Sequence, residues 1–185
     1  MKILSILTAA LAAFILCSCS NDEYRIHGRV SSNELEGARI FLVPVGHEEK
    51  ENVDSVLIHN HEFEFKGRKH WMCTVRLIAH ERHKGQDLLV ATEPGDIYVT
   101  IGPNSTGGGT PQNDSLQVWK DMTIYFNEHF GQLYNSGMID EAKAERAAYV
   151  KRTQEIALGL GKDSMVGEFL LNMYPLPAEE KKETE

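Results

Sequence analysis

The chain has 185 residues, 42% of them hydrophobic and 25% charged, a composition typical of a globular protein. This length predicts one domain, with room for a helical appendage. The formal net charge of −8 at pH 7 argues against nucleic acid as a partner, because its phosphates would be repelled.

The N-terminus predicts an export signal. Lys2 precedes an uncharged apolar run, residues 3–16, which is too short to span a bilayer comfortably. Cys19 follows a small residue and has Leu16 three places before it, a pattern that resembles a bacterial lipobox. We therefore predict a lipoprotein signal peptide over residues 1–18 and lipidation of Cys19. An uncleaved anchor and a plain secretory signal are the alternatives.

Lipidation would fix the place of the protein in the cell. A single acyl chain such as palmitate holds a protein only marginally, but the usual bacterial modification supplies more than one. Residues 19–23 would form an acidic tether, similar to the export signal of some Gram-negative surface lipoproteins. We expect attachment to a membrane of the cell envelope, the outer membrane, with the domain facing the periplasm or the cell surface.

Residues 24–106 predict an antiparallel β domain, because short segments of alternating apolar and polar residues recur at regular spacing. About seven to eight strands, in a β-sandwich or an open barrel, fit this pattern. The clearest segments are 24–30, 38–45, 54–58, 62–67, 71–79, 88–91 and 97–101.

Asn60, a residue that tolerates a left-handed backbone, predicts the tip of a hairpin in the middle of this domain. His59 and His61 flank it and, two residues apart on one strand face, could bind one metal ion. His80 and His83 form a second pair. Neither pair has an acidic or cysteine partner at ligand spacing, so we expect solvated loop histidines and no metal or other cofactor.

The run Glu93-Pro94-Gly95-Asp96 predicts a turn, because Pro presets φ and Gly accepts a positive φ. We expect it to join segments 88–91 and 97–101 as a hairpin. Glu93 and Asp96 could be a carboxylate pair for acid–base catalysis, but in such a turn we expect solvated turn formers.

A helical segment is expected over residues 107–177. Its first residues, Gly107-Gly108-Gly109, predict a linker and not a phosphate loop, since the lysine that such a loop needs is missing. Thr110 can cap a helix that has Pro111 at its first position, with Asn113 and Asp114 in the first turn.

Helical spacing predicts three helices in this segment. The first begins at Pro111 and has Gly131 near its end, the second covers 139–158, and the third runs from a capping Ser164 to Tyr174. The charged tail, 178–185, is expected to be disordered. The predicted fold class is α+β. We expect the aromatic residues of the first helix to be core and not a ligand box: Trp119, Tyr125, Phe126, Phe130 and Tyr134.

Cys73 is the remaining thiol if Cys19 is acylated and the signal peptide is removed, so no disulfide framework is expected. It lies in an apolar run, residues 71–75. We therefore predict a buried, inert cysteine; a reactive thiol is the alternative.

Four motifs taken together resemble a domain of unknown function found at the N-terminus of thioredoxin-like thiol-disulfide oxidoreductases in Gram-negative gut-type bacteria. They are residues 24–28, the segment 54–67, the turn 93–97 and the run 109–114. The resemblance covers about 24–119 and implies an accessory domain beside a catalytic one.

Two departures from that family limit what the resemblance implies. Family hairpins usually have Gly where His61 stands, so this turn is expected to be strained or rearranged. The family's catalytic domain would start about where this chain stops, and no Cys-x-x-Cys occurs in the sequence. Oxidoreductase activity is therefore not expected to carry over.

These observations predict a non-enzymatic module that binds a protein or envelope ligand through a sheet face or the groove between sheet and helices. No catalytic residues are expected; the site residues are those of the turn and cap, Glu93 to Asp96 with Thr110, Pro111, Asn113 and Asp114. The alternative is an accessory role for a separate thioredoxin-like reductase, or a redox role through Cys73. A hydrolase has no supporting motif.

Overall fold

The computed structural model describes residues 22–177. The predicted signal peptide, Cys19, the first residues of the tether and the tail 178–185 lie outside this range. Eight strands are followed by three helices, which confirms the predicted α+β class. The strands are β1 (Tyr24–Val30), β2 (Arg39–Pro44), β3 (Asp54–Leu57), β4 (Glu62–Gly67), β5 (Met72–Leu77), β6 (Leu88–Ala91), β7 (Gly95–Ile101) and β8 (Thr106–Gly108). The helices are α1 (Pro111–Asn135), α2 (Ile139–Leu160) and α3 (Met165–Met173).

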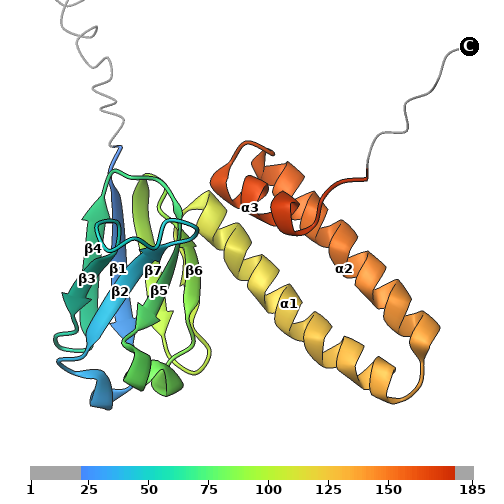
Figure 1. The fold of residues 1–185 in the computed structure, drawn as a ribbon, viewed down its shortest axis with the longest axis horizontal. Helices are drawn as coiled ribbons and strands as arrows, with labels where there is room; N and C mark the ends of the chain where they lie inside the picture. The colour runs from blue at the N-terminus through green and yellow to red at the C-terminus, as the bar shows by residue number, and fades with distance from the viewer. Residues whose placement is uncertain (1–21, 178–185) are drawn as a thin grey trace, which may run out of the picture.

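The strands form two four-stranded sheets that pack face to face as a sandwich and do not close into a barrel (Figure 1). One sheet has the order β4-β1-β7-β8 and the other β3-β2-β5-β6. Alternate residues point inward, as the alternating sequence predicts. The pairing is antiparallel with one exception: β1 and β7 run parallel, Ile26 opposite Ile97. The shared core includes Ile26, Ile40, Phe65, Val75, Val90, Ile97 and Ile101.

The predicted hairpin between residues 88–91 and 97–101 is wrong. Strand β6 pairs with β5, whereas β7 pairs with β1 and β8 in the other sheet. Pro94 and Gly95 do turn the chain, with Gly95 at φ +122°, but the turn is a corner that passes from one sheet to the other. Local turn chemistry marks the reversal and does not select the strand that becomes the partner.

The predicted hairpin with its tip at Asn60 is wrong beyond the tip itself. His59 and Glu62 form an isolated antiparallel bridge, but the strands that the turn joins, β3 and β4, belong to different sheets. Asn60 and His61 have positive φ, +52° and +62°, as expected for Asn60 and unusual for histidine. The Glu36 carboxylate accepts hydrogen bonds from the backbone N–H groups of His61 and Asn60, which lowers the pKa of that carboxyl. An anion from another loop therefore holds the turn in its left-handed conformation.

The glycine run is not the linker that its composition predicts. Gly107 and Gly108 lie in β8 and pair with Val99 and Tyr98 of β7. Gly109 has φ +101°, and a Cβ there would lie 2.7 Å from the Asp96 carbonyl oxygen. The strand is only three residues long, and the chain leaves it directly into α1.

Helices α1 and α2 form an antiparallel hairpin that extends away from the sandwich (Figure 1). Gly131 lies inside α1, which continues to Asn135 and so runs past the predicted end. Only the base of the hairpin packs on β6 and α3, through a second apolar cluster that includes Leu116, Trp119, Ala157, Val166 and Leu170. Among the residues that the structure describes, no helix has the length and hydrophobicity needed to cross a lipid bilayer.

Candidate functional site

Glu93, predicted as a solvated turn former, instead caps the first helix. Its half-buried carboxylate accepts hydrogen bonds from the backbone N–H of Gln112 (2.8 Å) and from Gln112 Nε2 (3.1 Å). Gln112 is the second residue of α1, where backbone N–H groups have no partner within the helix. The carboxylate satisfies one of these groups and suits the positive end of the helix dipole.

Asn113 fixes α1 to the edge of a sheet. Its Oδ1 accepts from the Ala91 N–H (3.0 Å), and its Nδ2 donates to the Ala91 carbonyl (2.8 Å). Ala91 ends β6, an edge strand, so the Asn113 amide pairs with it as a neighbouring strand would. The side chain is buried, which makes these bonds costly to break.

Thr110 occupies the N-cap position before Pro111, as predicted, but its side chain caps no backbone N–H. Its hydroxyl accepts from Asn113 Nδ2 instead (2.8 Å). Asp114 Oδ1 accepts from the N–H of Gly109 (2.8 Å), on the strand side of the junction. The Glu93 carboxylate therefore caps the helix, Asp114 ties the preceding strand to the first turn, and Thr110 accepts a hydrogen bond from the Asn113 amide.

Gln112 extends this network to the third helix. Its Oε1 accepts from the N–H of Val166 (3.0 Å), near the N-terminus of α3. Ser164 caps α3 by accepting from the Gly167 N–H, as predicted. We call Ala91, Glu93, Gln112, Asn113 and Asp114 the joint. Gln112 lies in the run 109–114, but nothing in that sequence predicts that its side chain connects the starts of two helices.

Asp96 does not join its predicted partners. It is exposed on the outer face of β7, and its Oδ1 lies 2.9 Å from His27 Nε2. His27 also stacks on Tyr98, with ring centroids 5.1 Å apart. Glu93 and Asp96 are thus engaged on separate partners, a cap and a surface histidine, which is not the arrangement of an acid–base pair.

The outer face of the β4-β1-β7-β8 sheet carries an open groove of about 810 Å³. Its floor includes His27, Tyr98 and Thr100, and Arg29 pairs with Glu62 along it at 3.0 Å. The charged groups that the groove presents are already paired with one another, which leaves them less available to a ligand.

Cys73 is buried on β5, with 2% of its surface exposed, which confirms the prediction of a buried thiol. Burial raises the pKa of the thiol to about 12. The thiolate is the reactive form in disulfide chemistry, and it is scarce at neutral pH in this setting. This arrangement favours the inert interpretation over direct redox work.

One histidine of each predicted pair lies next to an acidic residue. His59 lies 3.6 Å from Glu36, and His80 lies 3.6 Å from Glu81. Within residues 22–177 no group of three His, Cys, Asp or Glu side chains is placed to hold a metal ion.

The aromatic residues predicted as helix core divide into two sets. Trp119 is buried at the base of α1, and Phe126 stacks on Tyr149 of α2 at 4.3 Å. Tyr125 and Tyr134, in contrast, are 62% and 59% exposed, so the prediction of core is wrong for both. This packing role of Tyr149 was not predicted, although an isolated aromatic residue in an alanine-rich helix is typical of a packing contact.

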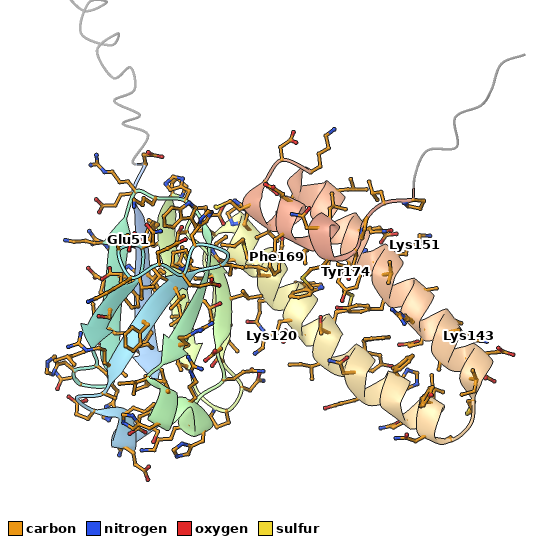
Figure 2. All side chains as sticks on the ribbon, in the orientation of Figure 1. Glu51, Lys120, Lys143, Lys151, Phe169 and Tyr174 are labelled. Carbon is orange, nitrogen blue, oxygen red and sulfur yellow. The ribbon has the colours of Figure 1, made fainter. Side chains whose placement is uncertain are left out.

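We call residues 123–155 the arm: the part of α1 and α2 beyond the apolar cluster at the base. The two helices pack mainly on each other here, through buried Ala142, Tyr149 and Thr153. Thr123 Oγ1 lies 2.9 Å from the Tyr149 hydroxyl. Figure 2 shows the arm standing clear of the sandwich, with Lys143 near its far end and Phe169 at its base. Tyr125, Tyr134, Met138 and Ile139 remain exposed on it.

Comparison with known proteins gives one family and no closer relative. Neither the curated proteins nor the solved structures yield a match. A family model described as a domain of unknown function, DUF4369, matches residues 24–116, which contain the sandwich and the joint and end in the second turn of α1. The chain belongs to this family of domains of unknown function.

Proposed function

We propose that this protein is a non-catalytic interaction module of the bacterial envelope, anchored through a lipidated Cys19, which binds a protein partner through the arm. The observation that carries the proposal is the exposure of large apolar and aromatic side chains along a two-helix projection. Exposed apolar surface often marks a site of protein–protein interaction.

The geometry of a helix pair explains why part of the apolar surface of α1 stays uncovered. Two helices can cover only one side of each other, whereas the apolar stripe of α1 is wider than one neighbour covers. Ile124, Phe126, Phe130 and Leu133 are each only partly buried. Exposed Tyr125 and Tyr134 extend the stripe on both sides.

The position of the arm fits attachment by the N-terminus. The chain enters the sandwich at Glu23, whose carbonyl accepts from the Gly95 N–H beside the joint. From that end the arm runs obliquely past the sandwich and away from it (Figure 1). In an anchored protein its tip would point away from the membrane.

A thioredoxin-like reductase is the partner that the family resemblance suggests. This chain would then supply the accessory domain in trans, and the reductase its own cysteines. The buried Cys73 argues against a redox step by this chain itself.

The arm is tested with Tyr125→Ser/Tyr134→Ser, compared with Tyr98→Ser on the sandwich, which removes a tyrosine of similar exposure (57%). The measurement is native electrophoresis of the full-length chain from envelope membranes in mild detergent. We expect the wild type and Tyr98→Ser to migrate in a larger complex and the double variant to migrate alone. Identical migration of all three would refute the proposal.

The anchor is tested separately by growth with radiolabelled palmitate. We expect the wild-type chain to incorporate label and the Cys19→Ser variant to incorporate none. Equal labelling of both chains, or of neither, would contradict lipidation at Cys19.

A further inference from the structure

One side of the α1–α2 hairpin is open at its base. A groove of about 330 Å³ lies there between the two helices. Val118, which is 55% exposed, and Ser115 line it from α1, and Ile156 and Gly159 line it from α2. The small residues Ser115 and Gly159 leave room for another backbone to come close to both helices.

The same side continues along the arm. Met122, Tyr125 and His129 follow Val118 at intervals of four, three and four residues, which places them on one face of α1. His129 Nδ1 lies 3.3 Å from Glu145 Oε1 of α2. The groove at the base and this contact farther out therefore belong to one continuous side of the hairpin.

The opposite side is closed by the chain itself. Gln154 Nε2 donates to the carbonyl oxygens of Tyr174 (3.3 Å) and Pro175 (2.8 Å). Tyr174 also packs edge-on against Tyr149, with ring centroids 5.6 Å apart. Figure 2 shows Tyr174 at this covered side, next to α2.

The open side is acidic. Helical spacing places Arg152 between Glu145 and Gly159, seven residues from each, on the same side of α2. Arg152 is already paired with Glu155 at 2.9 Å. Glu141 lies one turn before Glu145, and Asp114 lies at the base of the groove. An apolar floor is therefore bordered by excess negative charge.

We propose that this groove binds an amphipathic helix of a partner protein, with Lys or Arg beside its apolar face, to complete a three-helix bundle. The inference rests on the proposed function and names the chemistry of its partner. A groove between antiparallel helices accepts a third helix by ridge-into-groove packing. A second copy of this chain would bring the same negative groove, and a two-fold interface would set acid against acid.

Photo-crosslinking in intact cells tests this assignment on the full-length chain. Benzoylphenylalanine in place of Val118 or Tyr125 probes the groove; in place of Tyr134 or Lys143 it probes the other side of the arm. We expect adducts from the two groove positions, with the crosslinked partner segment, identified by mass spectrometry, showing apolar residues at helical spacing flanked by Lys or Arg.

A charge reversal is the second part of the test. Glu141→Lys/Glu155→Lys reverses exposed charges on the groove side, and Glu48→Lys/Glu51→Lys makes the same charge change on an exposed loop of the sandwich. We expect the Tyr125 adduct to be lost with the first pair and kept with the second. Both variants should keep the helical circular dichroism of the wild type.

Several results would overturn the assignment. Adducts from Tyr134 and Lys143 alone would place the partner on the other side and leave the proposed function standing. Three other results would each refute a basic partner helix. They are adducts between two copies of this chain, adducts with lipid, and a Tyr125 adduct that survives the groove-side charge reversal. No adduct from any of the four positions would overturn the proposed function as well.

Discussion

The sandwich and the arm treat their apolar residues in opposite ways. In the sandwich, side chains from both sheets meet in one core, and Ile26, Ile40 and Ile97 are completely buried. In the arm, the buried residues are Ala142, Tyr149 and Thr153, while Tyr125 and Tyr134 stand in solvent. The sandwich therefore buries its apolar residues within the fold, whereas the arm leaves large side chains exposed, and this is the surface that we propose a partner binds.

The joint connects the sandwich to the start of α1, and the arm lies beyond it. Its bonds are polar and specific in direction: a carboxylate on a helix start, and an amide on a strand edge. Such bonds fix the angle at which α1 leaves the sandwich, and apolar packing at the base then holds it. The difference between the regions can be tested by disturbing each in turn.

The largest effect is expected in the sandwich core. Phe65→Ala empties a fully buried site and should lower the free energy of unfolding by about 3–5 kcal/mol. Phe130→Ala removes the same side chain from the arm, where it is only partly buried, and should cost clearly less. Urea denaturation of both variants measures the comparison, and equal losses would show that the arm is packed as tightly as the sandwich.

The next effect is expected at the joint. Asn113→Ala leaves the Ala91 N–H and carbonyl buried without their partner, which should cost about 1–3 kcal/mol. Asn127→Ala, at an exposed position of the same helix, is the control and should change little. If thermal unfolding gave the same midpoint for both variants, the amide would not be what holds α1 to the sheet edge.

A smaller effect is expected inside the arm. Tyr149→Phe keeps the stack on Phe126 but removes the hydroxyl that meets Thr123, for a loss of about 1 kcal/mol. Tyr134→Phe removes an exposed hydroxyl and should be neutral. Urea denaturation followed by helical circular dichroism distinguishes them; a neutral Tyr149→Phe would mean that stacking alone joins the two helices there.

The smallest expected effect is on the alkylation of Cys73, which should not react in the native protein. Native Cys73 should resist alkylation at pH 8, because burial raises its pKa to about 12 and excludes the reagent. A Thr100→Cys variant, exposed on the sandwich, should be labelled at that position. Mass spectrometry after iodoacetamide treatment reads both; rapid labelling of native Cys73 would reopen a redox role.

The same thiol gives a pH dependence with a definite sign. In the unfolded chain it loses its proton near its ordinary pKa of 9.0, whereas in the native protein it keeps the proton to about 12. Across that interval the unfolded state binds fewer protons, so stability should fall as the pH rises. Cys73→Ala should flatten this part of the profile.

The strands and helices were predictable from the sequence because the spacing of apolar residues in each segment follows the face that the segment buries. The alternation from Tyr24 to Val30 and from Glu62 to Gly67 predicted β1 and β4 with their observed bounds. The helical spacing after Pro111 predicted α1. Pairing was less predictable: the parallel contact between β1 and β7 joins residues about seventy positions apart, which no local pattern encodes.

The site was predictable in part, for a related reason. The turn and cap residues were identified, but their roles depend on partners that only the fold supplies. The sequence predicts Glu93 as a turn residue, and its capping role follows only from its contact with Gln112 in the fold. Asn113 reads as a first-turn residue until Ala91 meets it. Gly131, a helix breaker by propensity, is tolerated within α1.

Amide hydrogen exchange tests the central claim, that the sandwich supports and the arm binds, most directly. Exchange would be followed by mass spectrometry on the full-length chain, once purified in detergent and once in native envelope vesicles. We predict that amides of residues 123–155 exchange faster than those of β1 and β7 in the purified chain and become protected in the vesicles, while the sandwich is unchanged. Protection that appears in the sandwich and leaves the arm as it was would contradict the account.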